Sequence, residues 1–205
     1  MRLRNIAILA TLLIVADQLL KIWIKTTMRI NEAIIIFPDW FQLRFVENNG
    51  AAFGMQLGGG SGFDWGKALL TSFRICMIGL LVWYIIRLVR SRAPKGAIVA
   101  LTMILAGALG NVIDCLFYGV IFSASTPMEV AHFGGSYASP FMGRVVDMFY
   151  FPLFQWNGIP SFLSFLVDSN NYFFGAIFNL ADSYISVAVL YILIFQQKFF
   201  IKEGE

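Results

Sequence analysis

Apolar residues along this chain form four runs, each about as long as a membrane-spanning helix. A helix needs roughly 20 predominantly apolar residues to cross about 30 Å of hydrocarbon. The four runs cover about residues 6–24, 68–89, 98–118 and 173–195. The pattern predicts four transmembrane helices, with a short link between the second and third and long connections over about 25–67 and 119–172.

Composition agrees with a membrane protein. The 205 residues are 59% hydrophobic and 13% charged, whereas a soluble domain carries about 25% charged residues. We therefore expect a single integral membrane domain spanning residues 1–205. The net charge of +3 is modest and gives no reason to expect nucleic acid as a partner. Arg2 and Arg4 precede the first run as in a signal peptide, but no cleavage site follows, so we interpret it as a retained helix.

Basic residues give an orientation. They lie before the first run, between the second and third, and after the fourth: Arg2, Arg4, Arg87, Arg90, Arg92, Lys95, Lys198 and Lys202. Cytoplasmic segments carry an excess of such residues. Both termini are therefore expected in the cytoplasm, and both long connections on the outer face of the membrane.

The first long connection contains a strand pattern. Apolar and polar residues alternate over Phe41–Phe45, and an apolar stretch, Ile34–Phe37, precedes the turn signal Pro38-Asp39. A small sheet on the membrane surface is expected here. The second long connection is rich in Phe, Tyr, Gly and Ser, and its apolar run over 162–167 is too short to span. The expected fold is thus an all-α membrane protein with a small extracytoplasmic sheet and a long second loop.

Three of the apolar runs each carry two polar residues on one helical face. The pairs are Asp17 and Lys21, Asn111 and Asp114, and Asn179 and Asp182. Because lipid cannot satisfy such groups, these faces should turn inward and meet. A purely structural hydrogen-bond network and a reaction centre are both compatible with this pattern.

Asp182 and Asp147 are the candidate reactive groups. A charged residue at the centre of a membrane helix costs about 2.5–3.5 kcal/mol on insertion scales. Asp182 is expected about nine residues, or roughly 14 Å, into the last run, and Asp147 in a loop that would dip toward it. Two carboxylates sharing one proton can hydrolyse a peptide bond: the ionised one takes a proton from water, and the protonated one polarises the carbonyl. This chemistry requires no cofactor or metal.

Other protease chemistries find little support. His132 is the single histidine, which excludes zinc-protease motifs and most serine triads. A rhomboid-like Ser–His pair would need a histidine within the membrane, whereas His132 falls in the second connection. Cys76 and Cys115 lie in apolar runs without metal-ligand spacing, so they are interpreted as small buried residues.

Five motifs together resemble the bacterial lipoprotein signal peptidases (signal peptidase II). In chain order they are Asp17-x-x-x-Lys21, Asn48-Asn-Gly50-Ala-Ala-Phe53-Gly54, Gly110-Asn111-Val-Ile-Asp114, Gly143-Arg-Val-Val-Asp147 and Phe178-Asn179-Leu-Ala-Asp182-Ser183. They extend from the first run to the last, in the family's order.

This resemblance implies an aspartyl endopeptidase of the bacterial inner membrane. It would remove signal peptides from prolipoproteins by cleaving before a diacylglyceryl-modified cysteine at the periplasmic face. The expected partners are such substrates and membrane lipids; the protein would act as a monomer and be inhibited by globomycin-type cyclic peptides. Asp147 and Asp182 would be catalytic, Asp17 and Lys21 supporting, and the substrate-binding residues would be Asn48, Gly50, Asn111, Asp114, Arg144, Asn179 and Ala181.

The chain departs from the family pattern in three respects. Cys115 stands where the family usually has an arginine after the Gly-Asn-x-x-Asp motif, and Arg144 where it often has a histidine. We hypothesise that Arg144 supplies the cation missing at Cys115. The third departure is the second connection, which is longer than expected. Separately, no partner for Arg74 within the second run is evident from the sequence.

Two other classes of function are considered. A proton-coupled transporter also places carboxylates in membrane helices, but it favours internal repeats and a polar path across the membrane. No repeat is visible, and the polar positions gather toward the outer half. A non-enzymatic scaffold would not need two carboxylates in separate motifs.

Overall fold

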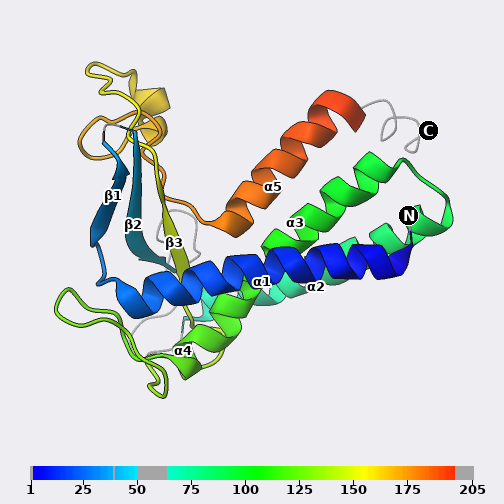
Figure 1. Ribbon diagram of the computed structural model, residues 1–205, viewed down its shortest axis with the longest axis horizontal. Helices are drawn as coiled ribbons and strands as arrows, with labels where there is room; N and C mark the ends of the chain where they lie inside the picture. Colours follow the sequence, from blue (N-terminus) through cyan, green and yellow to red (C-terminus); the bar gives the residue numbers. More distant parts are fainter. Residues whose placement is uncertain (1, 39, 50–63, 197–205) are drawn as a thin grey trace.

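The computed structural model describes residues 2–38, 40–49 and 64–196 (Figure 1). Among these residues, three helical segments are long and apolar enough to cross a membrane. They are α1 (Leu3–Thr27), α2 (Trp65–Arg90), and α3 (Lys95–Ile113), which continues through a π-helical turn (Asp114–Tyr118) and α4 (Gly119–Ile121). The first three expected spans are thus found, within a few residues of the predicted bounds. Gly50 of the second motif lies outside the described residues.

The prediction for the last span is wrong at its start. Helix α5 covers Leu180–Tyr191 and passes into a π-helical turn, Ile192–Gln196. Residues 173–178, which were expected to be helical, are extended or irregular, and Phe178 pairs with Phe149. A fourth helix of full spanning length is therefore not found within residues 64–196.

A three-stranded antiparallel sheet lies at the C-terminal end of α1. Its order is β1 (Ala33–Phe37), β2 (Phe41–Asn48) and β3 (Val145–Tyr150). The hairpin of the first two strands confirms the expectation from alternation. The third strand comes from the second long connection, and Asp147 pairs across it with Val46. Asp147 therefore lies on a buried strand and not in a dipping loop.

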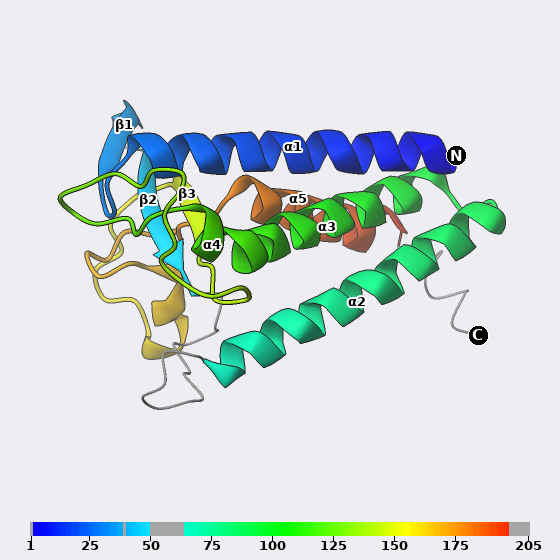
Figure 2. The same cartoon turned by 90° about the horizontal axis from the view of Figure 1, so that it is seen from below.

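Helix α3 is central among the helices. It contacts α1, α2 and α5, and Figure 2 shows it between α1 and α2. Small residues allow this close packing, as at other membrane helix contacts. A Cβ added at Gly110 would lie 2.6 Å from Oδ2 of Asp17, whereas one added at Gly79 on α2 would meet nothing within 4 Å.

Two apolar clusters hold the two ends together. One joins the end of α1 to the sheet, with Ile24 and Met28 packed against Phe45, Val146 and Met148. The other lies near the opposite ends of the helices and is made of Ile6, Ile85, Leu88, Ile98, Leu101 and Leu105. The sheet is thus fixed to the first span rather than suspended above it.

Residues 151–178 form an extension between β3 and α5. It contains a short 3₁₀ helix, Ser161–Leu166, and is drawn in yellow to orange at the far end of the sheet in Figure 1. Its base is closed by backbone hydrogen bonds between Phe149 and Phe178, of 2.7 and 3.1 Å. The chain therefore returns to β3 before it enters α5.

Candidate active site

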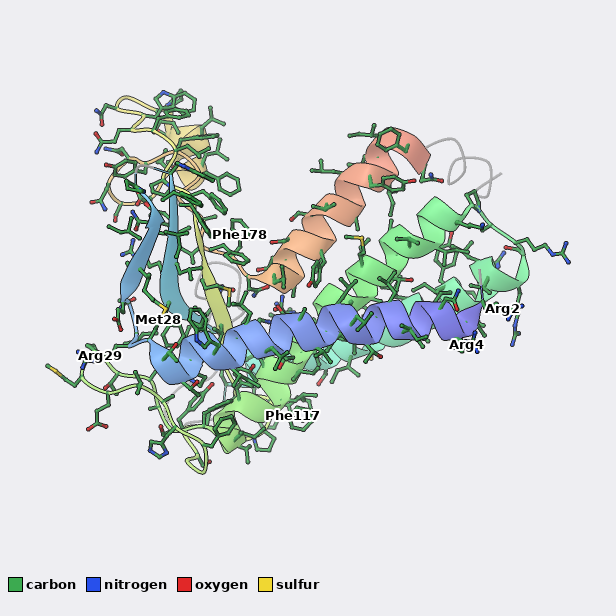
Figure 3. The ribbon with its side chains drawn as sticks, viewed as in Figure 1. Arg2, Arg4, Met28, Arg29, Phe117 and Phe178 are labelled. Atoms are coloured by element: carbon green, nitrogen blue, oxygen red, sulfur yellow. The ribbon has the colours of Figure 1, made fainter. Side chains whose placement is uncertain are left out.

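The polar residues of the helices meet those of the sheet between β3 and the start of α5. Phe178, labelled in Figure 3, marks this place, one residue before α5 is capped. Asp147 comes from the sheet, Asp182 from α5, Asn111 from α3 and Lys21 from α1. Elements far apart in the sequence are therefore required to complete the site.

Asp147 is almost fully buried, with 4% of its surface exposed. Its Oδ1 atom accepts a 2.7 Å hydrogen bond from Nδ2 of Asn179, and its Oδ2 accepts one of 3.3 Å from Nδ2 of Asn48. Burial of the carboxyl group and the nearby charge of Asp182 raise the pKa of Asp147 to about 7, and the two amide hydrogen bonds offset this only in part. Asp147 is thus suited to carry a proton near neutral pH.

Asp182 occupies a different environment. It is only partly buried and lies in the first turn of α5, not nine residues inside a span as the sequence predicted. Its Oδ1 accepts a 2.8 Å hydrogen bond from Nδ2 of Asn111, and its Oδ2 accepts one from the backbone N–H of Asn179. Asp182 therefore contacts one side-chain amide and one backbone N–H at the N-terminus of α5.

Asn179 connects the two carboxylates. As the N-cap of α5, its Oδ1 accepts a 2.9 Å hydrogen bond from the backbone N–H of Asp182. Its Nδ2 donates to Oδ1 of Asp147 and, at 3.1 Å, to Oδ1 of Asn111. The buried side chain of Asn179 therefore caps the helix that carries Asp182 and also donates a hydrogen bond to Asp147.

Lys21 lies beneath this group and is fully buried. Its Nζ atom is 3.0 Å from Oδ2 of Asp17, 2.8 Å from Oδ2 of Asp114 and 2.8 Å from Oδ1 of Asn111. Asp17 in turn accepts a 3.0 Å hydrogen bond from the backbone N–H of Ala181. Asn111 thus links the ammonium of Lys21 to the carboxylate of Asp182, because it accepts a hydrogen bond from the first and donates one to the second.

Of the expected site residues, the structure brings together Asn48, Asn111, Asp114, Asp147, Asn179, Ala181, Asp182, Asp17 and Lys21. Gly50 cannot be placed, because it lies outside the described residues. Arg144 is elsewhere: among the described residues, its guanidinium pairs with Glu47 and not with either of the two carboxylates. Its guanidinium is 44% exposed, donates to Oε2 of Glu47 at 3.2 Å and stacks on Tyr137.

Cys115 has a cationic neighbour on α2. The Nη1 atom of Arg74 on α2 lies 4.0 Å from Sγ of Cys115. Lys67, about two helical turns before Arg74 on the same helix, also has a buried side chain, which donates to the carbonyl of Met142 at 3.1 Å. A guanidinium from α2 therefore lies beside Cys115, and the hypothesis that Arg144 supplies the cation missing at Cys115 stays a prediction.

Two contributions were missed in the sequence. Gln18 donates 3.0 Å and 3.1 Å hydrogen bonds to the carboxylates of Asp114 and Asp17, and its position next to Asp17 in an apolar run was an available signal. Lys25 forms a buried ion pair with Glu47, and both contact the hydroxyl of Ser125. No local pattern links these three residues, since each comes from a different part of the chain.

No group of three or more His, Cys, Asp or Glu residues that could hold a metal ion occurs in the described part.

Comparison with known proteins identifies the family. The family model described as signal peptidase (SPase) II matches residues 9–198. The chain belongs to this family. A lipoprotein signal peptidase of Porphyromonas gingivalis is 44% identical over 192 residues, covering 92% of this chain and 81% of the relative. One from Amoebophilus asiaticus is 34% identical over 192 residues, covering 91% and 75%.

Solved structures agree in fold. A bacterial membrane enzyme determined by the in meso method at 1.9 Å resolution superposes with a TM-score of 0.62 at 23% identity, covering 95% of this chain and 93% of that one. A second such structure, at 2.3 Å, gives 0.59 over 95% and 88%. Together with the apolar helices, family membership establishes a multi-pass membrane protein.

Proposed function

We propose that this protein is a membrane aspartic endopeptidase that removes signal peptides from diacylglyceryl-modified prolipoproteins. The observation that carries the proposal is that Asn179 contacts both aspartates. Its side-chain amide donates to Asp147, and its side-chain oxygen accepts the backbone N–H of Asp182. Two carboxylates in one polar site, with one proton between them, suit general acid–base hydrolysis. A proton-coupled transporter is not supported by the family match.

The two carboxylates are assigned different roles. Asp147 is the more buried and has the raised pKa, so it keeps the proton and donates it toward the scissile carbonyl oxygen. Asp182 lies at a helix N-terminus and is linked to Lys21 through Asn111, and it is assigned the role of the base that takes a proton from the attacking water. After attack, Asp182 returns the proton to the leaving amine, and Asp147 recovers its own as the carbonyl re-forms.

The remaining site residues are proposed to position the peptide. Asn48, Asn111, Asp114, Asn179 and Ala181 lie around the two carboxylates, and Asp17 and Lys21 support the site from α1. Gly50 is included because it belongs to the same motif as Asn48. An apolar groove of about 500 Å³ between α2 and α3, with Arg74 in its lining, is of a kind that could receive acyl chains. Arg144 retains an exposed guanidinium at the sheet, where a substrate segment can still reach it.

Location and topology follow from the placement of charge. Arg2 and Arg4 lie at the end of α1 remote from the sheet, as Figure 3 shows, whereas Met28 and Arg29 lie beside it. By the positive-inside rule, the Arg2 end faces the cytoplasm. We therefore propose an inner-membrane protein with cytoplasmic termini, with the dyad and sheet at the periplasmic face. It would act as a monomer and be inhibited by globomycin-type cyclic peptides.

Cleavage of a lipid-modified prolipoprotein by the purified protein tests this function. Asp147→Asn and Asp182→Asn should each reduce turnover by about 10²–10⁴-fold, the usual contribution of a positioned acid or base. The matched control is Arg29→Gln, which replaces a charged side chain by an amide at an exposed residue just beyond the end of α1. This variant should cleave the substrate normally. Near-normal turnover in either aspartate variant would refute the dyad.

A further inference from the structure

Ten aromatic rings form a continuous cluster over the far end of the sheet and the extension. Neighbouring ring centroids are 4.8–6.4 Å apart. We call this cluster the aromatic surface; its members are Phe37, Trp40, Phe41, Phe149, Phe151, Phe154, Trp156, Phe173, Phe174 and Phe178. None is fully buried, and Phe37, Trp40, Phe154 and Phe174 are 41–52% exposed. A cluster of this size would normally form a core.

Strand β1 enlarges the exposed apolar area. All five of its residues, Ala33–Phe37, are apolar and exposed, and the strand lies at the edge of the sheet. In water, an uncovered apolar edge strand promotes association with other chains. This surface therefore requires a partner that the described residues do not provide.

The composition of the extension identifies the class of partner. Between Phe151 and Phe178 the single charged residue is Asp168. Its carboxylate accepts a 2.5 Å hydrogen bond from the hydroxyl of Tyr150 and two more from the backbone N–H groups of Asn170 and Tyr172. The remainder combines aromatic rings with neutral polar residues. This mixture is typical of proteins at the boundary between lipid headgroups and acyl chains.

The position of the sheet agrees with that partner. Helix α1 ends at Thr27 and β1 begins at Ala33, so the strand starts close to the end of a span. Figure 1 shows the strands running across the end of α1, and Figure 2 shows the sheet at the same end of the molecule. The sheet therefore runs along the membrane plane at the level where the first span emerges.

We propose that the aromatic surface binds lipid at the headgroup–acyl boundary of the outer leaflet. The contact extends to Phe178, whose neighbour Asn179 holds Asp147. Lipid bound there fixes the height of the dyad relative to the bilayer. A second copy of the chain, paired along β1, is the competing occupant, and the experiment separates the two.

Fluorescence quenching of Trp40 in reconstituted vesicles tests the proposal. The signal of Trp40 is obtained as the difference between the unaltered protein and Trp40→Phe, a change that keeps an aromatic ring. It is measured in phosphatidylcholine vesicles brominated near the headgroup end of the acyl chains, in vesicles brominated near the terminal methyl, and with acrylamide in the water. Trp83, which is 59% exposed on α2, supplies the control for lipid contact through Trp83→Phe.

Strong quenching of Trp40 by the headgroup-proximal bromines, several-fold above that by the methyl-proximal bromines or acrylamide, is the expected result. Quenching by acrylamide alone would place the surface in water and overturn the proposal. Absence of quenching by every agent, while Trp83 is quenched by lipid, would mean that protein covers Trp40 and would also overturn it. Neither outcome bears on whether the protein cleaves prolipoproteins, so the two proposals stand or fall separately.

Discussion

The side-chain amide of Asn179 donates a 2.7 Å hydrogen bond to Oδ1 of Asp147, and both residues are buried. Because Asn179 also caps α5, its loss should affect both stability and catalysis. Asn179→Ala removes the cap at a cost of about 0.5–2 kcal/mol, and it frees Asp147 from its strongest amide donor. We expect a lower unfolding temperature and a large loss of kcat in a prolipoprotein cleavage assay.

Asn179→Ser separates these two effects. A serine hydroxyl can accept the backbone N–H of Asp182 and so restore the cap, but it is too short to replace the amide bond to Asp147. The serine variant should regain stability and remain poorly active. Recovery of kcat together with stability would show that Asn179 acts only as a helix cap.

The raised pKa of Asp147 predicts how activity depends on pH. If Asp147 must be protonated, kcat/KM should fall as the pH rises above about 7, the value to which burial and Asp182 raise its pKa. The profile of Asp147→Asn, measured on whatever turnover remains, should lack this decrease, because an amide does not titrate in that range. A basic limb that persists unchanged in the variant would assign it to another group.

Stability should depend on the same ionisation, with a defined sign. The folded-state pKa of Asp147, about 7, is above its ordinary value of 3.8, so the folded protein binds this proton more tightly than the unfolded chain. Its stabilising effect is complete below pH 4, decreases as the pH rises to about 7, and is absent above. Thermal unfolding in detergent at several pH values should show a weaker dependence for Asp147→Asn than for the unaltered protein.

Glu47 is expected to contribute far more to stability than Arg144, although the two form an ion pair. Glu47 and Lys25 are buried, so Glu47→Gln leaves an ammonium without its charged partner, at a cost of about 3–5 kcal/mol. Arg144 is half-exposed, and Arg144→Ala should cost about 0–1 kcal/mol. Unfolding temperatures in detergent measure both, and a double variant, Lys25→Met with Glu47→Leu, should recover part of the loss.

Close contact between α1 and α3 gives a matched pair of glycine variants. Gly110→Ala places a methyl group against the carboxylate of Asp17 and should destabilise the protein by about 1–3 kcal/mol. Gly79→Ala meets open space on α2 and should be neutral or stabilising. Equal effects of the two changes on unfolding temperature would contradict the packing of α3 against α1.

The elements that were predicted correctly have local causes. The first three spans follow from uninterrupted apolar runs, and the β1–β2 hairpin follows from alternation around Pro38-Asp39. Strand β3 was missed because its pairing partner is a hundred residues away, and an aspartate in an apolar stretch looks like a loop. The meeting of the polar helix faces was predicted from the cost of exposing them to lipid.

The start of α5 was misplaced for a different reason. Hydropathy continues through Phe173–Phe178, but backbone pairing of Phe178 with Phe149 keeps that segment out of the helix. The sequence Asn179-Leu-Ala-Asp182 has the spacing of a capping box and could have marked the true start. The contact of Arg74 with Cys115 could not be predicted from the sequence, because it depends on how α2 packs.

The backbone pair between Phe149 and Phe178 makes the spacing of the dyad independent of the length of chain between its members. Asp147 precedes the closed base of the extension and Asp182 follows it, so the intervening residues need not cross the site. Replacement of residues 152–176 by a short Gly/Ser linker should leave kcat within a few-fold of the unaltered protein, measured on a detergent-solubilised substrate. The extension is in this sense an exchangeable insert, free to diversify in size and lipid preference while the reaction centre stays constant.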